Sequence, residues 1–161
     1  MTLGEFKGPP TPRTHALAAQ FEVAGVKIRV AENLAEARWK KLVWNIPFNG
    51  LSIATGGLTT DRICADPTLA TRVHQLMKEV QHAAAALGYT ISDEHLRQQF
   101  EVTPPMGKYR PSSLVDFLAG RDVEIEAIWG EPLRRAEAAG ASVPELARLY
   151  RELSTTASRR T

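Results

Sequence analysis

The residues whose spacing best suits chemistry lie in one apolar stretch, residues 41–54. Polar side chains recur there at Lys41, Asn45, Asn49 and Ser52. At 100° per residue, these four positions fall within a sector of roughly 80° around a helix. The stripe offers an amine, two amides and a hydroxyl for hydrogen bonding, so it faces either solvent or a lined cavity. Because asparagine is costly to bury without hydrogen bonds, the two amides require partners.

Pro47 lies within the same stretch. Proline has no backbone N–H, so a helix that runs through it leaves the carbonyl of Val43 without its usual donor. Two interpretations of the stripe are open. In one it lines a cavity; in the other it is a solvated seam, with the amides bonding water or a neighbouring loop and Lys41 a surface charge.

A second group of polar residues lies further along the chain, in residues 110–116 and 120–126. Ser113 and Asp116 have the spacing of a capping box in which Asp replaces the usual Glu or Gln. Glu124 in a first helical turn is favoured by the helix dipole. Both segments can therefore be structural, without any part in a site.

Other kinds of site have little support. The four histidines show no His-x-x-x-His spacing, so we expect no metal site. Cys64 is the single cysteine, which excludes an internal disulfide and a multi-cysteine cluster, and no activating base is evident for it. The sequence contains no Gly-x-Ser-x-Gly, Gly-x-Gly-x-x-Gly or Walker-type pattern.

The elements that must position these residues are almost all helical. Asp66 before Pro67 is typical of a helix start, and Ser142 three residues before Glu145 is similar. Glycines stand where three of the helices should end. The pattern predicts helices over residues 33–54, 67–87, 93–99, 113–119, 123–139 and 143–153.

Residues 1–31 show a different pattern. A short strand over Thr2–Phe6, a helix from Pro12 to Ala24 and an alternating strand over Gly25–Val30 follow one another. Strand, helix, strand is one unit of an α/β sheet, and two strands do not make a stable sheet by themselves. We therefore expect a mainly α chain, in which residues 1–31 are the remnant of a sheet domain and residues 32–161 form a helical domain.

Composition narrows the class of protein. The 161 residues are 43% hydrophobic and 24% charged, which excludes general disorder and a collagen-like repeat. Twenty Lys and Arg against eighteen Asp and Glu give a net charge of +2, too balanced to indicate nucleic acid or an acidic lipid surface as a partner. No apolar run reaches the ~18–20 residues of a membrane span, and the N-terminus lacks a secretory pattern. We expect a cytoplasmic protein with neither a nucleic-acid nor a membrane partner.

Five segments are more informative in their order than singly. They are Leu3-Gly4-Glu5-Phe6, Gly25-Val26-Lys27-Ile28, Trp39-Lys40-Lys41-Leu42-x-x-Asn45-x-x-x-Asn49, Pro111-Ser112-Ser113-x-x-Asp116 and Gly120-Arg121-x-x-Glu124-Ile125-Glu126. In this order they resemble the carboxy-terminal half of the ketopantoate reductase family, the 2-dehydropantoate 2-reductases and their relatives. The resemblance extends from about Leu3 to Tyr150. It implies a helical domain preceded by the last strand–helix–strand of an NADP-binding Rossmann domain.

The resemblance also implies an activity, the NADPH-dependent reduction of a 2-oxo acid, ketopantoate to pantoate, in the pantothenate and CoA pathway. Lys41 matches the catalytic lysine, which protonates the carbonyl oxygen as hydride arrives on the carbon. A lysine suits this task because it is charged at neutral pH and polarises the carbonyl before it gives up the proton. Glu124 matches the acidic residue that binds the substrate hydroxyl near that lysine.

Three further positions match substrate-binding residues of the family. Asn45 and Asn49 correspond to residues that hold the lysine and the substrate. Ser112 corresponds to the serine that binds the substrate carboxylate, and Ser113, one residue away, is the alternative.

The chain departs from the family in one large respect. The family's glycine-rich nucleotide-binding turn and its nicotinamide-proximal asparagine belong to an amino-terminal domain that this sequence does not contain. We therefore expect the chain alone to be inactive, with that Rossmann domain, or a subunit carrying it, as its partner. The alternative is a non-enzymatic helical module that forms a homodimer or binds a partner through its exposed apolar surface and strand edges.

Overall fold

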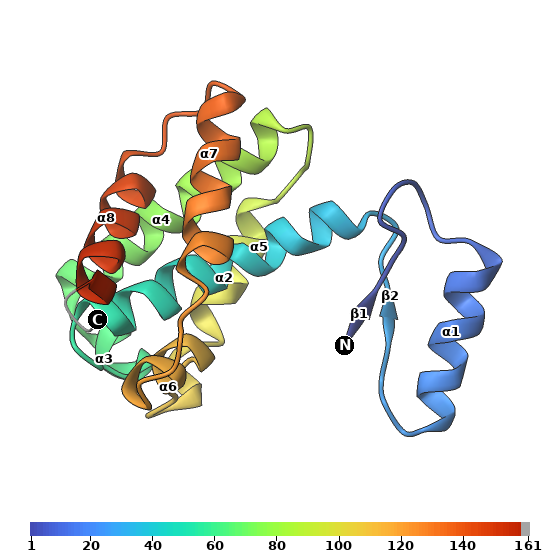
Figure 1. Ribbon diagram of the computed structural model, residues 1–161, viewed down its shortest axis with the longest axis horizontal. Coiled ribbons are helices and arrows are strands. Elements are labelled where there is room, and N and C mark those ends of the chain that lie inside the picture. Colours follow the sequence, from blue (N-terminus) through green and yellow to red (C-terminus); the bar gives the residue numbers. More distant parts are fainter. Residues whose placement is uncertain (159–161) are drawn as a thin grey trace. The chain divides into compact units, whose positions relative to one another are not determined.

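The chain divides into two compact units, Met1–Lys41 and Leu42–Thr161, in the computed structural model, which describes residues 1–158. Most of the chain is helical, and a short parallel pair of strands lies near the N-terminus (Figure 1). The expected mainly α fold with a strand–helix–strand start is thus confirmed. No helix in residues 1–158 combines the length and the apolar character needed to cross a bilayer.

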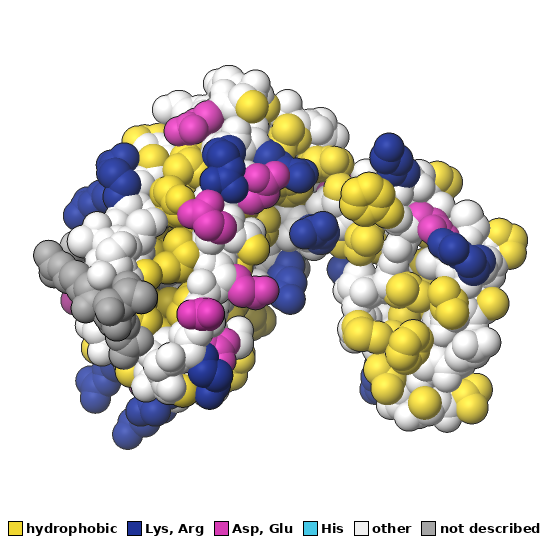
Figure 2. All heavy atoms as spheres, in the orientation of Figure 1, with side chains coloured by type: hydrophobic (Ala, Val, Ile, Leu, Met, Phe, Trp, Pro, Cys, Tyr) yellow, Lys and Arg dark blue, Asp and Glu magenta, His cyan; other side chains and the backbone are white. Residues whose placement is uncertain are grey.

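The first unit is built around two very short strands. β1 (Thr2–Leu3) and β2 (Arg29–Val30) pair in parallel, and α1 (Pro12–Val23) connects them. Both strands are shorter than the sequence pattern predicts. Apolar side chains gather on the visible face of this unit (Figure 2). Among its apolar residues, Phe6 and Val23 are 83% and 92% exposed.

Helix α1 begins with a reciprocal pair of threonines. The hydroxyl of Thr11 accepts a hydrogen bond from the N–H of Thr14, and the hydroxyl of Thr14 accepts one from the N–H of Thr11. Both hydroxyls also donate to the carboxylate of Glu5. This arrangement satisfies backbone N–H groups that a helix start leaves without partners, and it ties α1 to the end of β1.

Helix α2 (Leu34–Ala54) carries the polar stripe and runs through Pro47. Asn33 caps it, since its side-chain oxygen accepts from the N–H of Glu36 at 3.1 Å. The predicted range of this helix was 33–54, so the prediction is confirmed. In the second unit its apolar residues Val43, Ile46 and Leu51 are fully buried.

The remaining elements of the second unit are helices and helical turns (Figure 1). The structure adds the short helix α3, which the sequence pattern did not predict, and it divides the predicted helix 123–139 into a π turn and α7. The elements are α3 (Thr60–Ala65), α4 (Pro67–Ala86), α5 (Asp93–Glu101), a 3₁₀ turn (Pro104–Met106), α6 (Ser112–Leu118), a π turn (Glu126–Gly130), α7 (Glu131–Ala138) and α8 (Pro144–Ser158).

Glycine at position 50 lets α2 approach its neighbours closely. A Cβ atom there would lie 2.6 Å from Cδ2 of Leu149 and 2.9 Å from Nε1 of Trp129. The indole N–H of Trp129 donates to the carbonyl of Ile46 at 3.0 Å. Trp129 is fully buried, so the π turn that carries it is anchored directly on α2.

The starts of α4 and α8 are capped differently. Asp66 accepts from the N–H groups of Thr68 and Leu69 at 2.8 and 3.0 Å, which confirms the predicted start of α4. At α8 the carboxylate of Glu79, on α4, accepts from the N–H groups of Glu145 and Leu146 at 2.9 and 2.8 Å. A side chain distant in sequence therefore supplies the cap expected from Ser142.

Candidate functional site

The side chains of the polar stripe become more buried along α2. Lys41 is exposed and Asn45 is half-buried. Asn49 and Ser52 are only 2% and 0% exposed. A solvated seam does not describe the second half of this stripe. Among the described residues, the Oγ atom of Ser52 is buried without a hydrogen-bond partner.

Asn49 joins α2 to the start of α6. Its Nδ2 donates to the carbonyl of Asn45 at 3.2 Å, and its Oδ1 accepts from the N–H of Ser113 at 3.1 Å. The N–H groups in the first turn of a helix have no partner within that helix. The Asn49 amide therefore satisfies one of them from another element, and it fixes the beginning of α6 against the stripe.

The side chains of the two candidate serines differ in their exposure to solvent. Ser112, the first residue of α6, has an exposed side chain, whereas Ser113 is 6% exposed. The capping box expected from Ser113 is wrong, because α6 already begins at Ser112 and has no side-chain cap. Asp116, its expected partner, instead accepts from Arg121 at 2.7 and 2.8 Å.

Charged residues that lie close together in the sequence differ in their hydrogen-bond and ion-pair partners. Lys40 donates to Glu36 at 2.5 Å, whereas the exposed side chain of Lys41 has no hydrogen-bond or ion-pair partner within residues 1–158. The carboxylate of Glu126 accepts from the hydroxyl of Tyr150 and, at 2.8 Å, from Arg134. Glu124, two residues earlier, is exposed.

These contacts change the acidity of the Glu126 cluster. The hydrogen bond from Tyr150, followed by that from Arg134, holds the pKa of Glu126 below its usual range. The same carboxylate raises the pKa of the Tyr150 hydroxyl, because the phenolate would face a negative charge. Glu126 is thus committed to contacts within the protein, which leaves Glu124 as the candidate carboxylate of this segment.

An aromatic pair lies beside the stripe. The ring centroids of Trp44 and Tyr109 are 6.1 Å apart in an edge-to-face arrangement. Trp44 also packs on Phe48, with centroids 5.1 Å apart. Its indole N–H donates to Oγ1 of Thr103 at 2.9 Å. Nothing in the sequence around Thr103 indicated this contact, which joins positions 59 residues apart.

Cysteine and metal chemistry find little support in this geometry. Burial, followed by the nearby charge of Asp61, raises the pKa of the Cys64 thiol to about 11, so the thiol is protonated at neutral pH and a poor nucleophile. Within residues 1–158, no three His, Cys, Asp or Glu side chains gather in a way that could hold a metal ion.

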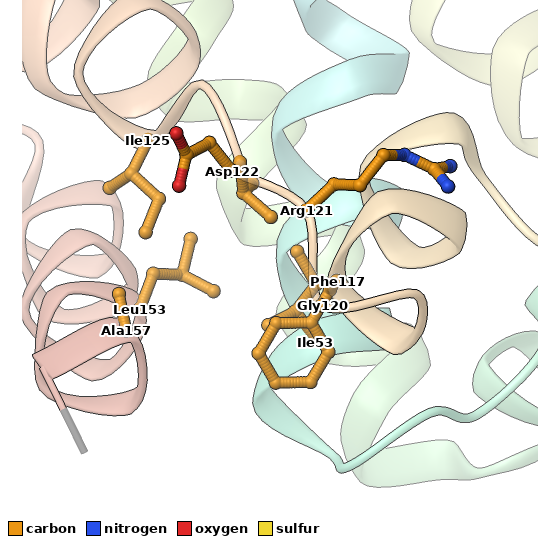
Figure 3. Close-up of a pocket in the computed structure, with 9 residues that line it drawn as sticks. Ile53, Phe117, Gly120, Arg121, Asp122, Ile125, Leu153 and Ala157 are labelled. Atoms are coloured by element: carbon orange, nitrogen blue, oxygen red, sulfur yellow. The ribbon is translucent and has the colours of Figure 1, made fainter. Parts of the chain in front are cut away.

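A separate pocket of about 440 Å³ lies in the second unit (Figure 3). Arg121 points away from it, while Ile53 and Leu153 line its apolar part. None of the five predicted site residues lines it. The residues that do are Ile53, Phe117, Gly120, Arg121, Asp122, Val123, Ile125, Leu153 and Ala157.

Comparison with known proteins gives a consistent result. Residues 33–157 match the family model described as ketopantoate reductase PanE/ApbA C terminal. A 2-dehydropantoate 2-reductase of Nostoc sp. is 40% identical over 143 residues, which are 89% of this chain and 44% of that protein. The chain spans about half the length, or less, of the curated relatives it matches.

Solved structures agree on the fold. The crystal structure of 2-dehydropantoate 2-reductase from Methylococcus capsulatus has a TM-score of 0.94 at 35% identity, covering 99% of this chain and 51% of that one. A D-mandelate dehydrogenase in complex with NADH has a TM-score of 0.90 at 18% identity, covering 99% of this chain and 55% of that one. The second similarity shows a shared fold alone.

Proposed function

The chain belongs to the ketopantoate reductase family through its carboxy-terminal domain, and from this premise we propose that it supplies the substrate-binding and proton-donating side of a 2-oxo acid reductase. Ketopantoate is the proposed substrate and pantoate the proposed product. The observation that carries the proposal is the hydrogen bond between Asn49 and the N–H of Ser113. It ties the helix with the lysine–asparagine stripe to the helix that begins with Ser112.

Each residue of the proposed site has a distinct task. Lys41 holds a proton on Nζ and releases it to the carbonyl oxygen of the substrate as negative charge develops there. Glu124 accepts from the substrate hydroxyl, and the hydroxyl of Ser112 binds the carboxylate. The exposure of all three side chains supports these roles.

The two asparagines divide between binding and positioning. Asn45 is half-buried, and its amide is proposed to bind the substrate. Asn49 has both ends of its amide occupied, so we assign it the positioning of Asn45 and α6. Because Oδ1 of Asn49 already accepts from the N–H of Ser113, we propose that Asn49 affects the substrate only through Asn45 and α6.

The domain assignment is also a proposal. Residues 1–31 are the last strand–helix–strand of a nucleotide-binding domain, and residues 32–161 are the helical substrate domain. The parallel pairing of β1 and β2 across α1 supports the first part. The family model beginning at residue 33 supports the second.

The proposed cofactor of the whole enzyme is NADPH, but the residues of this chain do not fit it as a binding site. The sequence has no Gly-x-Gly-x-x-Gly turn, and the first unit offers two strands of two residues each. A Rossmann domain binds the pyrophosphate of the nucleotide through such a turn and the helix start behind it. We propose that other residues, on the same polypeptide or a separate subunit, bind the nucleotide, and that the chain alone is inactive.

The test compares two adjacent lysines in the complete enzyme. This is obtained by fusing the chain to the part of the Nostoc relative that lies outside the matched 44% of that protein. Because general acid catalysis contributes about 10²–10⁴-fold, Lys41→Ala should lower kcat by that order without changing the melting temperature.

Lys40→Ala is the matched control. Lys40 forms an ion pair with Glu36 across one helical turn, and such pairs stabilise a helix by only about 0.3–0.5 kcal/mol. Its kcat should therefore stay near that of the unchanged enzyme. Equal losses of kcat from the two variants would contradict the catalytic assignment of Lys41.

A second candidate function is association with a second copy or another partner, without catalysis. The exposure of Phe6 and Val23 in the first unit favours it, since large exposed apolar side chains mark interaction surfaces when they gather. Light scattering distinguishes the two. A monodisperse monomer that binds no apolar dye would exclude association of this chain.

A further inference from the structure

The pocket of the second unit is lined mainly by apolar side chains (Figure 3). Two of them, Ile53 and Leu153, belong to the core and are 3% and 0% exposed. Ala157 follows Leu153 by one turn of α8 and lines the pocket with it. Val123 and Ile125, which are half-buried, complete this apolar surface. The volume of about 440 Å³ lies within the range of small-molecule sites, about 300–1,000 Å³.

A carboxylate without a partner stands at this pocket. Asp122 is one of the lining residues, and its carboxylate points toward Ile125 (Figure 3). Within residues 1–158 this carboxylate has no hydrogen-bond or ion-pair partner. The neighbouring Arg121 does not neutralise it, because its guanidinium donates to Asp116 at 2.7 and 2.8 Å. The pocket therefore combines an apolar surface with an available negative charge.

The pocket adjoins the turn that carries Glu124. The N–H of Ile125 donates to the carbonyl of Val123 at 2.7 Å, which closes a three-residue turn with Glu124 at its centre. Val123 and Ile125 line the pocket, whereas Glu124 does not and is exposed. A molecule in the pocket would therefore contact the residues on both sides of Glu124.

We propose that this pocket binds a small organic cation, an amine on an apolar body, and that the bound molecule restrains the turn that presents Glu124. The apolar body contacts Ile53 and Leu153, and the ammonium group pairs with Asp122. Charge complementarity selects this class of ligand, because a neutral molecule leaves the carboxylate unpaired and an anion is repelled by it. Binding is independent of the proposed function, whereas any effect on catalysis through Glu124 rests on it.

The experiment is an NMR titration of the ¹⁵N-labelled full chain, followed at the amide signals of residues 117–125. Three probes share a phenyl ring on a short chain and differ in charge: 2-phenylethylammonium, 2-phenylethanol and 3-phenylpropanoate. The ammonium compound should bind about fivefold more tightly than the alcohol, the upper range for a partly exposed ion pair. Because salt screens such a pair, this preference should largely disappear at about 1 M salt. Phenylpropanoate should bind more weakly than either, and methylammonium, which lacks the ring, should not bind measurably.

Two variants test the role of the carboxylate. Asp122→Asn should make the ammonium compound and the alcohol bind equally. Glu124→Gln removes the same charge two residues away, outside the pocket lining, and should keep the fivefold preference. Equal loss of the preference in both variants would assign it to the general charge of the segment and overturn the pairing with Asp122.

A second pair of variants tests the location. Ala157 is exposed on α8, so a larger side chain there fills the pocket without displacing the core. Ala157→Trp should abolish binding of both the ammonium compound and the alcohol. Thr155→Trp adds the same ring at an exposed position outside the pocket lining and should bind both as the unchanged chain does. The melting temperatures of the two variants show that each is folded.

Hydrogen exchange tests the effect on the turn. The N–H groups of Ile125 and Ile128 donate to the carbonyls of Val123 and Glu124. Saturating 2-phenylethylammonium should slow the exchange of these two amides and leave the amides of α4 unchanged. Binding without this change would contradict the restraint of the turn.

The remaining outcomes also decide the proposal. Equal binding of the ammonium compound and the alcohol to the unchanged chain would exclude an organic cation as the preferred ligand. Binding that persists in Ala157→Trp would place the ligand outside the pocket. Absence of binding by all probes would remove the site. None of these results bears on the reduction of a 2-oxo acid, which Lys41→Ala tests separately in the fused enzyme.

Discussion

Two pairs of identical residues that lie close together in the sequence differ in whether their side chains have partners within the protein. Lys40 donates a hydrogen bond to Glu36. Glu126 accepts hydrogen bonds from Tyr150 and Arg134. Lys41 and Glu124, one and two residues away, have no side-chain hydrogen-bond or ion-pair partner within the described residues 1–158. A charge already satisfied within the protein has less to offer a substrate, because binding would first require breaking its existing contacts. This difference supports the proposal that Lys41 and Glu124, and not their neighbours, act on the substrate.

The Glu126–Tyr150 contact predicts a pH effect at a single residue. The pKa of Tyr150 is raised by the carboxylate that accepts its hydrogen bond. Glu126→Gln should lower it towards the ordinary value of about 10, as followed by the ultraviolet absorbance of tyrosinate. Glu124→Gln, two residues away, should leave the titration of Tyr150 unchanged. A shift of equal size in both variants would assign the effect to the general charge of the segment.

The opposite shift of Glu126 has a consequence at low pH. Its pKa is lower in the folded chain than in the unfolded chain, so the stabilising contact is fully present above the unfolded pKa. The contact is lost as the pH falls through the lowered folded value. Acid should therefore weaken the link between the π turn and α8 before it affects the apolar core.

At the scale of elements, the link between α2 and α6 depends on one amide. Asn49→Ala leaves the N–H of Ser113 without a partner in a buried position, which costs about 1–3 kcal/mol. Asn49→Asp keeps an acceptor for that N–H but loses the donor to Asn45. Urea unfolding should therefore rank the unchanged chain first, Asn49→Asp second and Asn49→Ala last. Equal midpoints for Asn49→Ala and the unchanged chain would remove the positioning role.

Because α2 approaches α8 closely at Gly50, we expect Gly50→Ala to destabilise the protein, although helix propensity alone would predict stabilisation. Replacing a helical glycine by alanine normally stabilises by about 0.8–1.0 kcal/mol. At Gly50 the added Cβ would overlap Leu149 and Trp129, and overpacking costs about 1–3 kcal/mol. Gly50→Ala should therefore lower the free energy of unfolding. The loss should shrink in a Leu149→Ala background, where one of the two overlapping groups is absent; an undiminished loss would point to Trp129 alone.

Local signals in the sequence predicted most helices but not the contacts between them. The start of α4 was predictable because Asp66 and Pro67 act on their own helix. Helix α3 was missed because it is six residues long, and its first N–H is held by the distant carbonyl of Tyr109. The cap of α8 by Glu79 was missed for the same reason, since 66 residues separate donor and acceptor.

The candidate site was predictable to a similar extent. The spacing of Lys41, Asn45 and Asn49 placed them on one helical stripe, which α2 confirms. The increasing burial along that stripe and the commitment of Asn49 to α6 depend on tertiary packing. Residue spacing carries no information about such packing, so the division between binding and positioning residues had to come from the structure.

At the scale of the whole molecule, the two units differ in how much interior they possess. Most buried apolar side chains belong to Leu42–Thr161, whereas Ala18, Ala31 and Trp39 are the buried apolar residues described in Met1–Lys41. A two-stranded sheet is marginal in water without further strands or extensive helix packing. We therefore expect the first unit, considered by itself, to have a low free energy of local unfolding.

This difference predicts two levels of hydrogen-exchange protection in one chain. Local opening needs less free energy where few apolar contacts must be broken. The amides of α1 and the β1–β2 pair should therefore exchange faster than those of α4 and α8, as measured by mass spectrometry on the intact chain. If a nucleotide-binding region completes the sheet, expressing the chain with it should slow exchange in residues 1–31 and leave α4 unchanged. Protection that is equal in both units of the chain alone would show that the first unit is stable by itself, and it would remove the physical reason for expecting a sheet partner.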